Sequence, residues 1–200
     1  MTNNFNEAVK ERRTYYGIGK EKVVSEERIE EIIKNSIKYS PTAYNSQGSR
    51  AVVLFGEAHN KLWDITRETL RKIVSPEVFR SSTEVKINSF QSGYGTVLFF
   101  EDDTVIESYQ KQYTLYKDNF PVWAQQSNGM LQYVVWTSLE DEGLGASIQH
   151  YNPLIDNEVK TKWEIPNNWR LIAQMPFGNR TAKPNEKQHR PIEERFKVFK

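Results

Sequence analysis

Four short polar segments of this 200-residue chain carry side chains whose types and spacing suit ligand binding. The first segment holds Arg12, Arg13 and Thr14, at the end of an expected helix. A guanidinium group can hold a phosphate through two parallel hydrogen bonds, and a hydroxyl adds a neutral donor. The segment therefore suits a phosphate group. A solvated helix end has the same composition and stands as the alternative.

The second segment is SPTAYNSQGSR, the eleven residues from Ser40 to Arg50, which join an expected helix to an expected strand. Thr42, Asn45 and Gln47 offer one hydroxyl and two amides, and each of these groups can both donate and accept. Such groups match the rim of a flat heteroaromatic ring, whereas an anion would call for positive charge. A polar turn of the Asx type is the alternative.

The third segment begins with Gly143-Leu144-Gly145 and continues through Gln149 and His150 to Pro153. Small residues after a long helix allow a ligand to approach the backbone closely. A plain glycine stop of the helix explains the same residues without a ligand.

The fourth segment is the basic cluster KQHR, which starts at Lys187 and ends at Arg190. Because it lies near the end of the chain, it could complete a phosphate site whose other residues come from the beginning. Alone, the cluster is too common a feature to indicate a site.

Other familiar catalytic and cofactor motifs are incomplete. Three Gly-x-Gly pairs lack the third glycine of a dinucleotide-binding loop. The sequence GASIQ places Gln149 where a nucleophile elbow needs glycine. The three histidines lie far apart, and the acidic runs at 101–103 and 140–142 are typical of helix capping and solvation. We therefore expect neither a metal site nor a catalytic side chain of these kinds.

Composition limits the remaining classes. The net charge is +1, which gives no general attraction to nucleic acid or anionic membranes. No cysteine is present, so disulfides and thiolate chemistry are excluded. The N-terminal residues lack the apolar stretch of a signal peptide, and the longest apolar runs are too short to cross a bilayer. A cytoplasmic protein is expected.

The hydrophobic pattern predicts the elements that hold these segments in one domain, residues 1–200. Helices are expected over residues 3–13, 57–74, 105–116, 123–142 and 155–163, with another capped by Ser25 and ended by Pro41 and one opening at Pro76. Strands are expected over residues 51–55, 96–100, 146–148 and 170–175, and the tail ERFKVF, 194–199, has strand-like alternation. This order indicates an α+β or α/β domain with a sheet covered on both faces.

Taken together and in order, the four segments resemble the FMN-dependent nitroreductase family, over about residues 5–195. Finer details are similar to the branch of fatty-acid-repression and copper-induced nitroreductases. The chain departs from the wider family at Tyr16, where many members have a second basic residue, and at Gly48-Ser49, which replaces Pro-Trp. The matched residues are Arg12, Arg13 and Thr14 for Arg-Arg-Ser/Thr, Pro41, Thr42, Asn45 and Gln47 for Pro-Ser-x-x-Asn-x-Gln, Gly143, Leu144 and Gly145 for Gly-Leu-Gly, and Lys187 or Gln188 with Arg190 for a basic pair.

This resemblance implies an α+β sandwich with a mainly antiparallel sheet flanked by helices, in an intertwined homodimer that holds FMN at its interface. The implied phosphate ligands are Arg12, Arg13, Thr14 and Arg190, with Lys187 beside them. The segment Pro41, Thr42, Asn45 and Gln47 would contact the flavin ring and ribityl chain, Gly143, Leu144, Gly145, Gln149 and His150 would line one side, and Lys86 would face the N1/O2 edge.

The resemblance also implies ping-pong chemistry, in which NAD(P)H gives hydride to flavin N5 and a nitroaromatic or quinone acceptor is then reduced. The cofactor carries this step, so no catalytic side chain is expected. Tyr109, Tyr113, Tyr116 and Phe120 form either a wall over the flavin or part of the dimer interface. The alternatives are a flavin-binding stress-response or lipid-signalling regulator with little turnover, and a cofactor-free interaction module.

Overall fold

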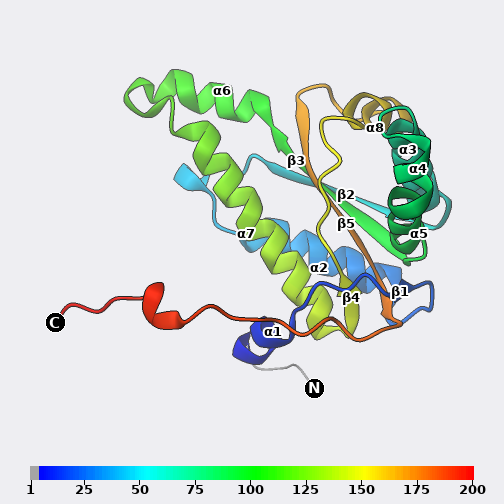
Figure 1. Ribbon diagram of the computed structural model, residues 1–200. Coiled ribbons are helices and arrows are strands. Elements are labelled where there is room, and N and C mark those ends of the chain that lie inside the picture. Colours follow the sequence, from blue (N-terminus) through cyan, green and yellow to red (C-terminus); the bar gives the residue numbers. More distant parts are fainter. Residues whose placement is uncertain (1–4) are drawn as a thin grey trace.

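The computed structural model describes residues 5–200 and is built around a five-stranded sheet in which every paired strand is antiparallel (Figure 1). Every residue of β3 is buried, as expected for a central strand covered on both faces. The sheet has the order β1-β5-β3-β2, with β4 also pairing with β5. The strands are β1 (Ile18–Gly19), β2 (Ser49–Phe55), β3 (Gly95–Asp102), β4 (Leu144–Ala146) and β5 (Trp169–Arg180).

Helices cover both faces of this sheet (Figure 1). Helices α3, α5 and α8 pack on one face, and α2 and α7 pack on the other. The helices are α1 (Phe5–Glu11), α2 (Glu26–Tyr39), α3 (Gly56–Arg71), α4 (Pro76–Val78), α5 (Glu84–Gln91), α6 (Asp103–Gln112), α7 (Phe120–Asp141) and α8 (Asp156–Lys162).

Two apolar cores lie on either side of the sheet because successive side chains of a strand point to opposite faces. Leu98 and Phe100 of β3 pack with Trp63 in the core beneath α3. Val97 and Phe99 of the same strand pack into the core beneath α2 and α7. The predicted α+β class, with a mainly antiparallel sheet flanked by helices, is confirmed.

Most expected elements are present with shifted ends. Ser25 caps α2 by accepting the N–H of Arg28 at 3.2 Å, as predicted, and Pro76 opens α4. The third expected strand begins at Leu144 instead of Ala146, and the two-residue strand β1 was not predicted. The expected start of the first helix at Asn3 lies outside the described residues. None of the helices within residues 5–200 is long and apolar enough to span a bilayer.

The tail differs most from the prediction. Instead of a strand it holds a short 3-10 turn, Ile192–Glu194, and then runs on without regular structure. Figure 1 shows it leaving the body of the protein beyond α1. Its apolar side chains, Phe196, Val198 and Phe199, are exposed. A strand needs a neighbour for its backbone hydrogen bonds, and the described part of the chain provides none at the tail.

Candidate functional site

The segment that follows α1 is fixed by the short strand β4. The backbone of Thr14 forms a bridge with Ala146, and the N–H of Tyr15 donates to the Ala146 carbonyl at 3.0 Å. The buried ring of Tyr15 packs against Gly145, where a Cβ atom would lie 2.9 Å from Tyr15. The guanidinium of Arg180 also lies over this ring, 4.8 Å from its centroid. Gly145 thus provides the room that Tyr15 needs.

Arg12 and Arg13 are held in different ways on this segment. The guanidinium of Arg12 lies over the ring of Trp136 in α7, 4.3 Å from its centroid. Its Nε atom is buried and has no hydrogen-bond partner among residues 5–200. Arg13 donates to the carbonyl of Asn185, which lies in the C-terminal segment. The described residues therefore leave one buried donor of Arg12 unsatisfied, a cost that a bound acceptor would remove.

The C-terminal segment completes a groove around these arginines. Its volume is about 620 Å³, and it is lined by Arg12, Arg13, Thr14, Tyr16, Gly17 and residues 182–188. Lys187 thus joins the three predicted phosphate ligands from more than 170 residues along the chain. Arg190 lies exposed three residues beyond Lys187 and does not line the groove.

The segment from Ser40 to Arg50 has an unusual backbone. Tyr44, Asn45 and Gln47 all have positive φ angles, of 56°, 53° and 51°. Non-glycine residues adopt this region at a cost of about 1 kcal/mol or more each, and such residues concentrate at ligand sites. The hydroxyl of Thr42 accepts the N–H of Gln47 at 3.0 Å, which closes the loop. The segment is therefore more than a turn between helix and strand.

An aromatic cluster supports this loop through Tyr44. The ring of Tyr44 lies 4.8 Å from that of Tyr113, 5.5 Å from Phe120 and 5.9 Å from Trp123. Tyr109 packs on Phe120 at 5.6 Å. The aromatic residues predicted to form a wall or an interface are thus gathered at the start of α7, beside the loop. Trp123 was not singled out in the sequence, although it stands in the same aromatic stretch.

The two groups of candidate ligands lie at opposite ends of α7 (Figure 1). Arg12 contacts Trp136, and Tyr44 of the loop contacts Trp123. These tryptophans are 13 residues apart on one helix, which is about 20 Å at about 1.5 Å per residue. Within one chain, the points at which the arginines and the loop contact α7 are therefore well separated.

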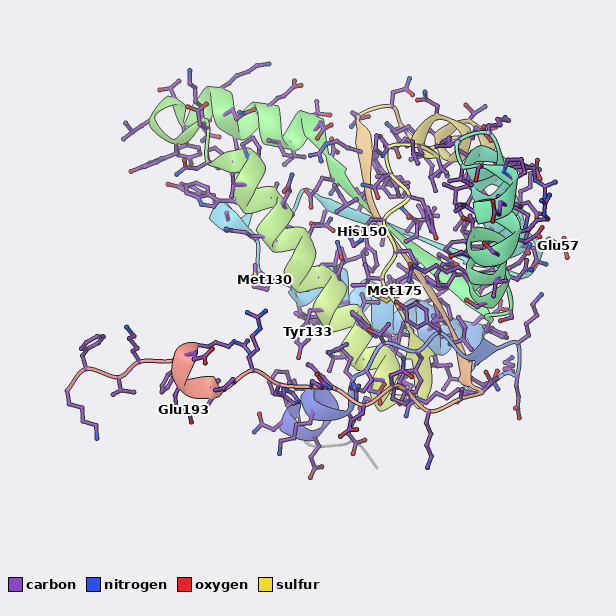
Figure 2. All side chains as sticks on the ribbon, in the orientation of Figure 1. Glu57, Met130, Tyr133, His150, Met175 and Glu193 are labelled. Carbon is purple, nitrogen blue, oxygen red and sulfur yellow. The ribbon has the colours of Figure 1, made fainter. Side chains whose placement is uncertain are left out.

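The residues of the third predicted segment differ in their exposure to solvent. Gly143 has φ of 83° and ends α7, as a glycine stop does. Leu144 is buried within β4, and the side chain of Gln149 donates to the hydroxyl of Ser147 at 3.1 Å. His150 is exposed just beyond (Figure 2). The burial of Leu144 and Gly145 favours a supporting role for them over contact with a ligand.

Lys86 lies exposed on α5, one helical turn before Phe90. The rings of Phe90 and Tyr16 are 6.2 Å apart, and Tyr16 follows Thr14 by two residues. Because residues four apart share a helix face, Lys86 lies on the side of α5 that faces this segment.

Comparison with known proteins decides the family. The profile of the nitroreductase family matches residues 9–179. The chain belongs to the nitroreductase family. As a nitroreductase it is an oxidoreductase, and the resemblance drawn from the four segments is confirmed.

Individual relatives of this nitroreductase cover nearly the whole chain. It is 37% identical over 180 residues to HBN1 of Saccharomyces cerevisiae, which is 89% of each protein. The structure of nitroreductase CinD from Lactococcus lactis in complex with chloramphenicol is 43% identical, covers 98% of this chain and 100% of that chain, and has a TM-score of 0.87. The same nitroreductase in complex with 4-nitrophenol has a TM-score of 0.86.

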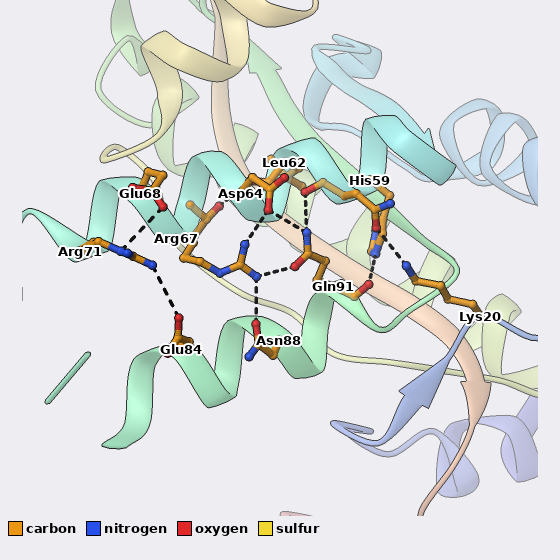
Figure 3. Close-up of polar contacts among 12 residues, drawn as sticks. Lys20, His59, Leu62, Asp64, Arg67, Glu68, Arg71, Glu84, Asn88 and Gln91 are labelled. Atoms are coloured by element: carbon orange, nitrogen blue, oxygen red, sulfur yellow. Dashed lines mark hydrogen bonds and ion pairs between the residues drawn. The ribbon is translucent and has the colours of Figure 1, made fainter. Parts of the chain in front are cut away.

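A second polar cluster, which includes His59 of α3 and Gln91 of α5, lies between these two helices of the nitroreductase (Figure 3). His59 Nε2 lies 3.2 Å from the Gln91 carbonyl, which can only accept, so this nitrogen carries the proton. His59 Nδ1 lies 2.8 Å from the hydroxyl of Thr96. Burial lowers the pKa of His59 from its ordinary value of 6.5 to about 4. Within residues 5–200, no group of histidines and acids is arranged to hold a metal ion.

The sequence did not reveal one buried group close to the loop. Asp102 caps α6 by accepting the N–H of Thr104 at 3.1 Å, as the acidic run predicted. Its neighbour Glu101 is instead buried, and its carboxyl group accepts hydrogen bonds from Ser49 and Asn128. Burial raises the pKa of Glu101 above its ordinary value. The one sequence signal for this burial is the continuous apolar run at residues 96–100, directly before Glu101, which indicates a buried strand that Glu101 could extend.

Proposed function

We propose that the protein is an FMN-dependent oxidoreductase that takes hydride from NAD(P)H and reduces nitroaromatic or quinone acceptors. The groove in which Arg12, Arg13, Thr14 and Lys187 meet carries this proposal. The arginines have fixed supports, and Arg12 keeps a buried donor without a partner. These features fit a phosphate group. Support for the acceptor class comes from CinD, whose structures contain chloramphenicol and 4-nitrophenol.

In this proposal the groove holds the phosphate of FMN. Arg12 and Arg13 would provide charge-assisted hydrogen bonds, and Thr14 would add its hydroxyl. Lys187 would contribute positive charge from the C-terminal segment. Arg190 would join them through a local movement of that exposed segment, which carries no regular structure between β5 and Ile192. Leu144 and Gly145 would act by holding Tyr15, and so the position of Thr14.

The loop would contact the flavin from a second copy of the chain. Pro41, Thr42, Asn45 and Gln47 offer a hydroxyl and amides, which suit the donors and acceptors on the flavin rim. Because the loop and the arginines of one chain are about 20 Å apart along α7, a complete site requires the arginines of one protomer and the loop of its partner. FMN would then bind at the interface of a homodimer.

Two exposed surfaces support that homodimer. Helix α7 carries apolar side chains on its exposed side, including Val122, Met130 and Val134 (Figure 2 shows Met130). The tail extends from the body with further exposed apolar residues, and β2 is an edge strand of the sheet. A tail that adds to the partner's sheet would satisfy its backbone and intertwine the protomers.

The chain's own residues would bind, orient and shield the reactants. When bound, FMN supplies hydride acceptance and donation at N5, so the protein needs no acid–base pair. Lys86 would place positive charge near the N1/O2 edge. Gly143, Gln149 and His150 would line one side of the ring, and the aromatic cluster at Tyr44 would exclude water from the other. The cytoplasmic location expected from the sequence remains a prediction.

An absorption spectrum of the purified protein, followed by turnover assays, tests the proposal. A yellow protein that oxidises NADPH or NADH with 4-nitrophenol or a quinone as acceptor is the expected result. Yellow protein without turnover on any such acceptor would favour a flavin-binding regulator. A colourless protein that takes up no FMN on reconstitution would contradict both and favour an interaction module.

A further inference from the structure

A buried carboxyl group joins three elements directly behind the loop. Glu101, at the end of β3, is only 1% exposed. The hydroxyl of Ser49 in β2 donates to its Oε1, and Nδ2 of Asn128 in α7 donates to the same oxygen at 2.9 Å. Asn128 is itself fully buried, and its Oδ1 accepts from Gln132 at 2.7 Å. A single oxygen of Glu101 therefore ties β2 to α7.

The backbone that leaves the loop is fixed by the same end of β3. The carbonyl of Gly48 accepts the N–H of Asp102 at 3.0 Å. Arg50 donates to the Gln47 carbonyl at 2.6 Å and pairs with Asp102 at 2.9 Å. A Cβ atom on Gly48 would lie 3.0 Å from Glu101 Oε2, so the carboxyl group and the loop are in close contact. A movement of Glu101 would thus shift the backbone of the loop at Gln47.

The contacts of Glu101 also give a structural reason for the position at which this chain departs from the wider family. The resemblance to nitroreductases places Pro-Trp where this chain has Gly48-Ser49. Glycine leaves space for Oε2 of Glu101, and the short side chain of Ser49 brings a hydroxyl to Oε1. A buried carboxyl group is retained in proteins where its oxygens have such donors.

We propose that Glu101 is a positioning residue for the flavin site, which through Ser49 and Asn128 fixes the Thr42–Gln47 loop relative to helix α7. The inference rests on the proposed function, in which this loop contacts FMN at the dimer interface. Asn128 is followed in α7 by Gly129, which lies on the exposed side of the helix. Glu101 therefore holds the loop and the interface helix in one arrangement.

Binding of FMN to the full-length protein, freed of cofactor and followed by quenching of flavin fluorescence, tests this role. Glu101→Leu removes the acceptor of the Ser49 hydroxyl and one of the two acceptors of Asn128 Nδ2, which keeps its bond to the Phe100 carbonyl at 3.1 Å. The variant is expected to weaken FMN binding about 10-fold or more. Glu101→Gln keeps an oxygen acceptor and is expected to bind within about 3-fold of wild type. Thr66→Val is the matched control, because Thr66 has a buried hydroxyl in α3 that donates to the Leu62 carbonyl within the same helix.

Double variants separate positioning from general loss of stability. If Glu101 acts through the loop, adding Glu101→Leu to a Gln47→Ala variant should weaken FMN binding little further. Adding Glu101→Leu to an Arg12→Ala variant should weaken FMN binding by its full factor. Equal effects in both backgrounds, or unchanged FMN binding by Glu101→Leu, would overturn the inference. Ser49→Ala carries the same test if Glu101→Leu does not fold.

The outcomes also distinguish this inference from the proposed function. Wild-type protein that binds no FMN would overturn both. Wild-type protein whose FMN binding is weakened by Arg12→Ala and Gln47→Ala, but not by changes at Glu101 and Ser49, would overturn only the role of Glu101.

Discussion

The guanidinium of Arg12 lies 4.3 Å from the centre of the Trp136 ring, and its Nε atom is buried without a hydrogen-bond partner. The contact joins the segment after α1 to the central helix α7. A guanidinium held on an aromatic face keeps its N–H edge free, since the attraction involves the flat side of the group. Trp136 therefore orients Arg12 without using its donors.

Trp136→Leu tests this orientation. The substitution keeps an apolar side chain but removes the attraction of the ring for the cation, which is worth about 0.5–2 kcal/mol. We expect FMN to bind about 3- to 30-fold more weakly, as measured by fluorescence titration. Trp163→Leu on the opposite side of the sheet serves as the control, and equal loss of FMN affinity in both variants would contradict the role of Trp136.

Removal of both arginines tests the phosphate site itself. Arg12→Ala with Arg13→Ala deletes two charge-assisted contacts, each worth about 1.5–3 kcal/mol. FMN affinity should fall by about 100-fold or more. Arg80→Ala, at an exposed arginine outside the groove, should leave the affinity unchanged. An unaltered dissociation constant for the double variant would remove the phosphate assignment.

Gly145→Ala probes the support of that segment by β4. The added Cβ would lie 2.9 Å from Tyr15, and overpacking of this kind costs about 1–3 kcal/mol. We expect a lower Tm together with weaker FMN binding, because Tyr15 carries Thr14 with it. The partial rescue of both properties by Tyr15→Leu in the same chain would identify the clash as the cause. Wild-type stability of Gly145→Ala would show that the strand accommodates the methyl group.

Met130→Glu tests the proposed dimer interface on α7. Met130 is 42% exposed in the single chain, and a charge buried at an interface without a partner opposes association. We expect monomers in light scattering after gel filtration, with FMN affinity lost because the two halves of the site separate. Val85→Glu, at a 63% exposed position of α5, should stay dimeric. A monomeric wild type that binds FMN fully would contradict the two-chain site.

The sequence predicted the sheet and the main helices because their apolar side chains recur at regular spacing. Ile29, Ile32 and Ile33 mark the buried side of α2, and the run from Thr96 to Phe100 marks β3. The tail has strand-like alternation but forms no strand within the described chain, because alternation alone does not provide a neighbour. The spacing of apolar residues within one segment shows which side of that segment would be buried. It does not show which other element would pack against that side.

The site could be predicted only in part for a similar reason. Arg12, Arg13, Thr14 and Lys187 were identified from residue type, and the structure places them around one groove. The role of Gly145 depends on contact with Tyr15, 130 residues away, which no local pattern contains. The sequence places Glu101 in an acidic run typical of helix capping, whereas its burial depends on Ser49 and Asn128, which come from distant elements.

His59 gives the stability a defined dependence on pH. Its side chain is 1% exposed, and its folded pKa of about 4 lies below the ordinary value of 6.5. Between these values the unfolded chain binds a proton that the folded chain excludes. The stabilisation is therefore complete above pH 6.5 and is lost as the pH falls toward 4, by about 3 kcal/mol in total.

His59→Gln isolates this contribution, because glutamine can keep polar contacts with Thr96 and Gln91 but does not titrate. Urea unfolding between pH 4 and pH 8 should show a constant difference in unfolding free energy between wild type and variant above pH 6.5. Below that pH the difference should shift in favour of the variant, since only the wild type loses stability through this histidine. His189→Gln, in the exposed tail, should reproduce the wild-type profile. Parallel profiles for wild type and His59→Gln down to pH 4 would mean that His59 accepts its proton in the folded state.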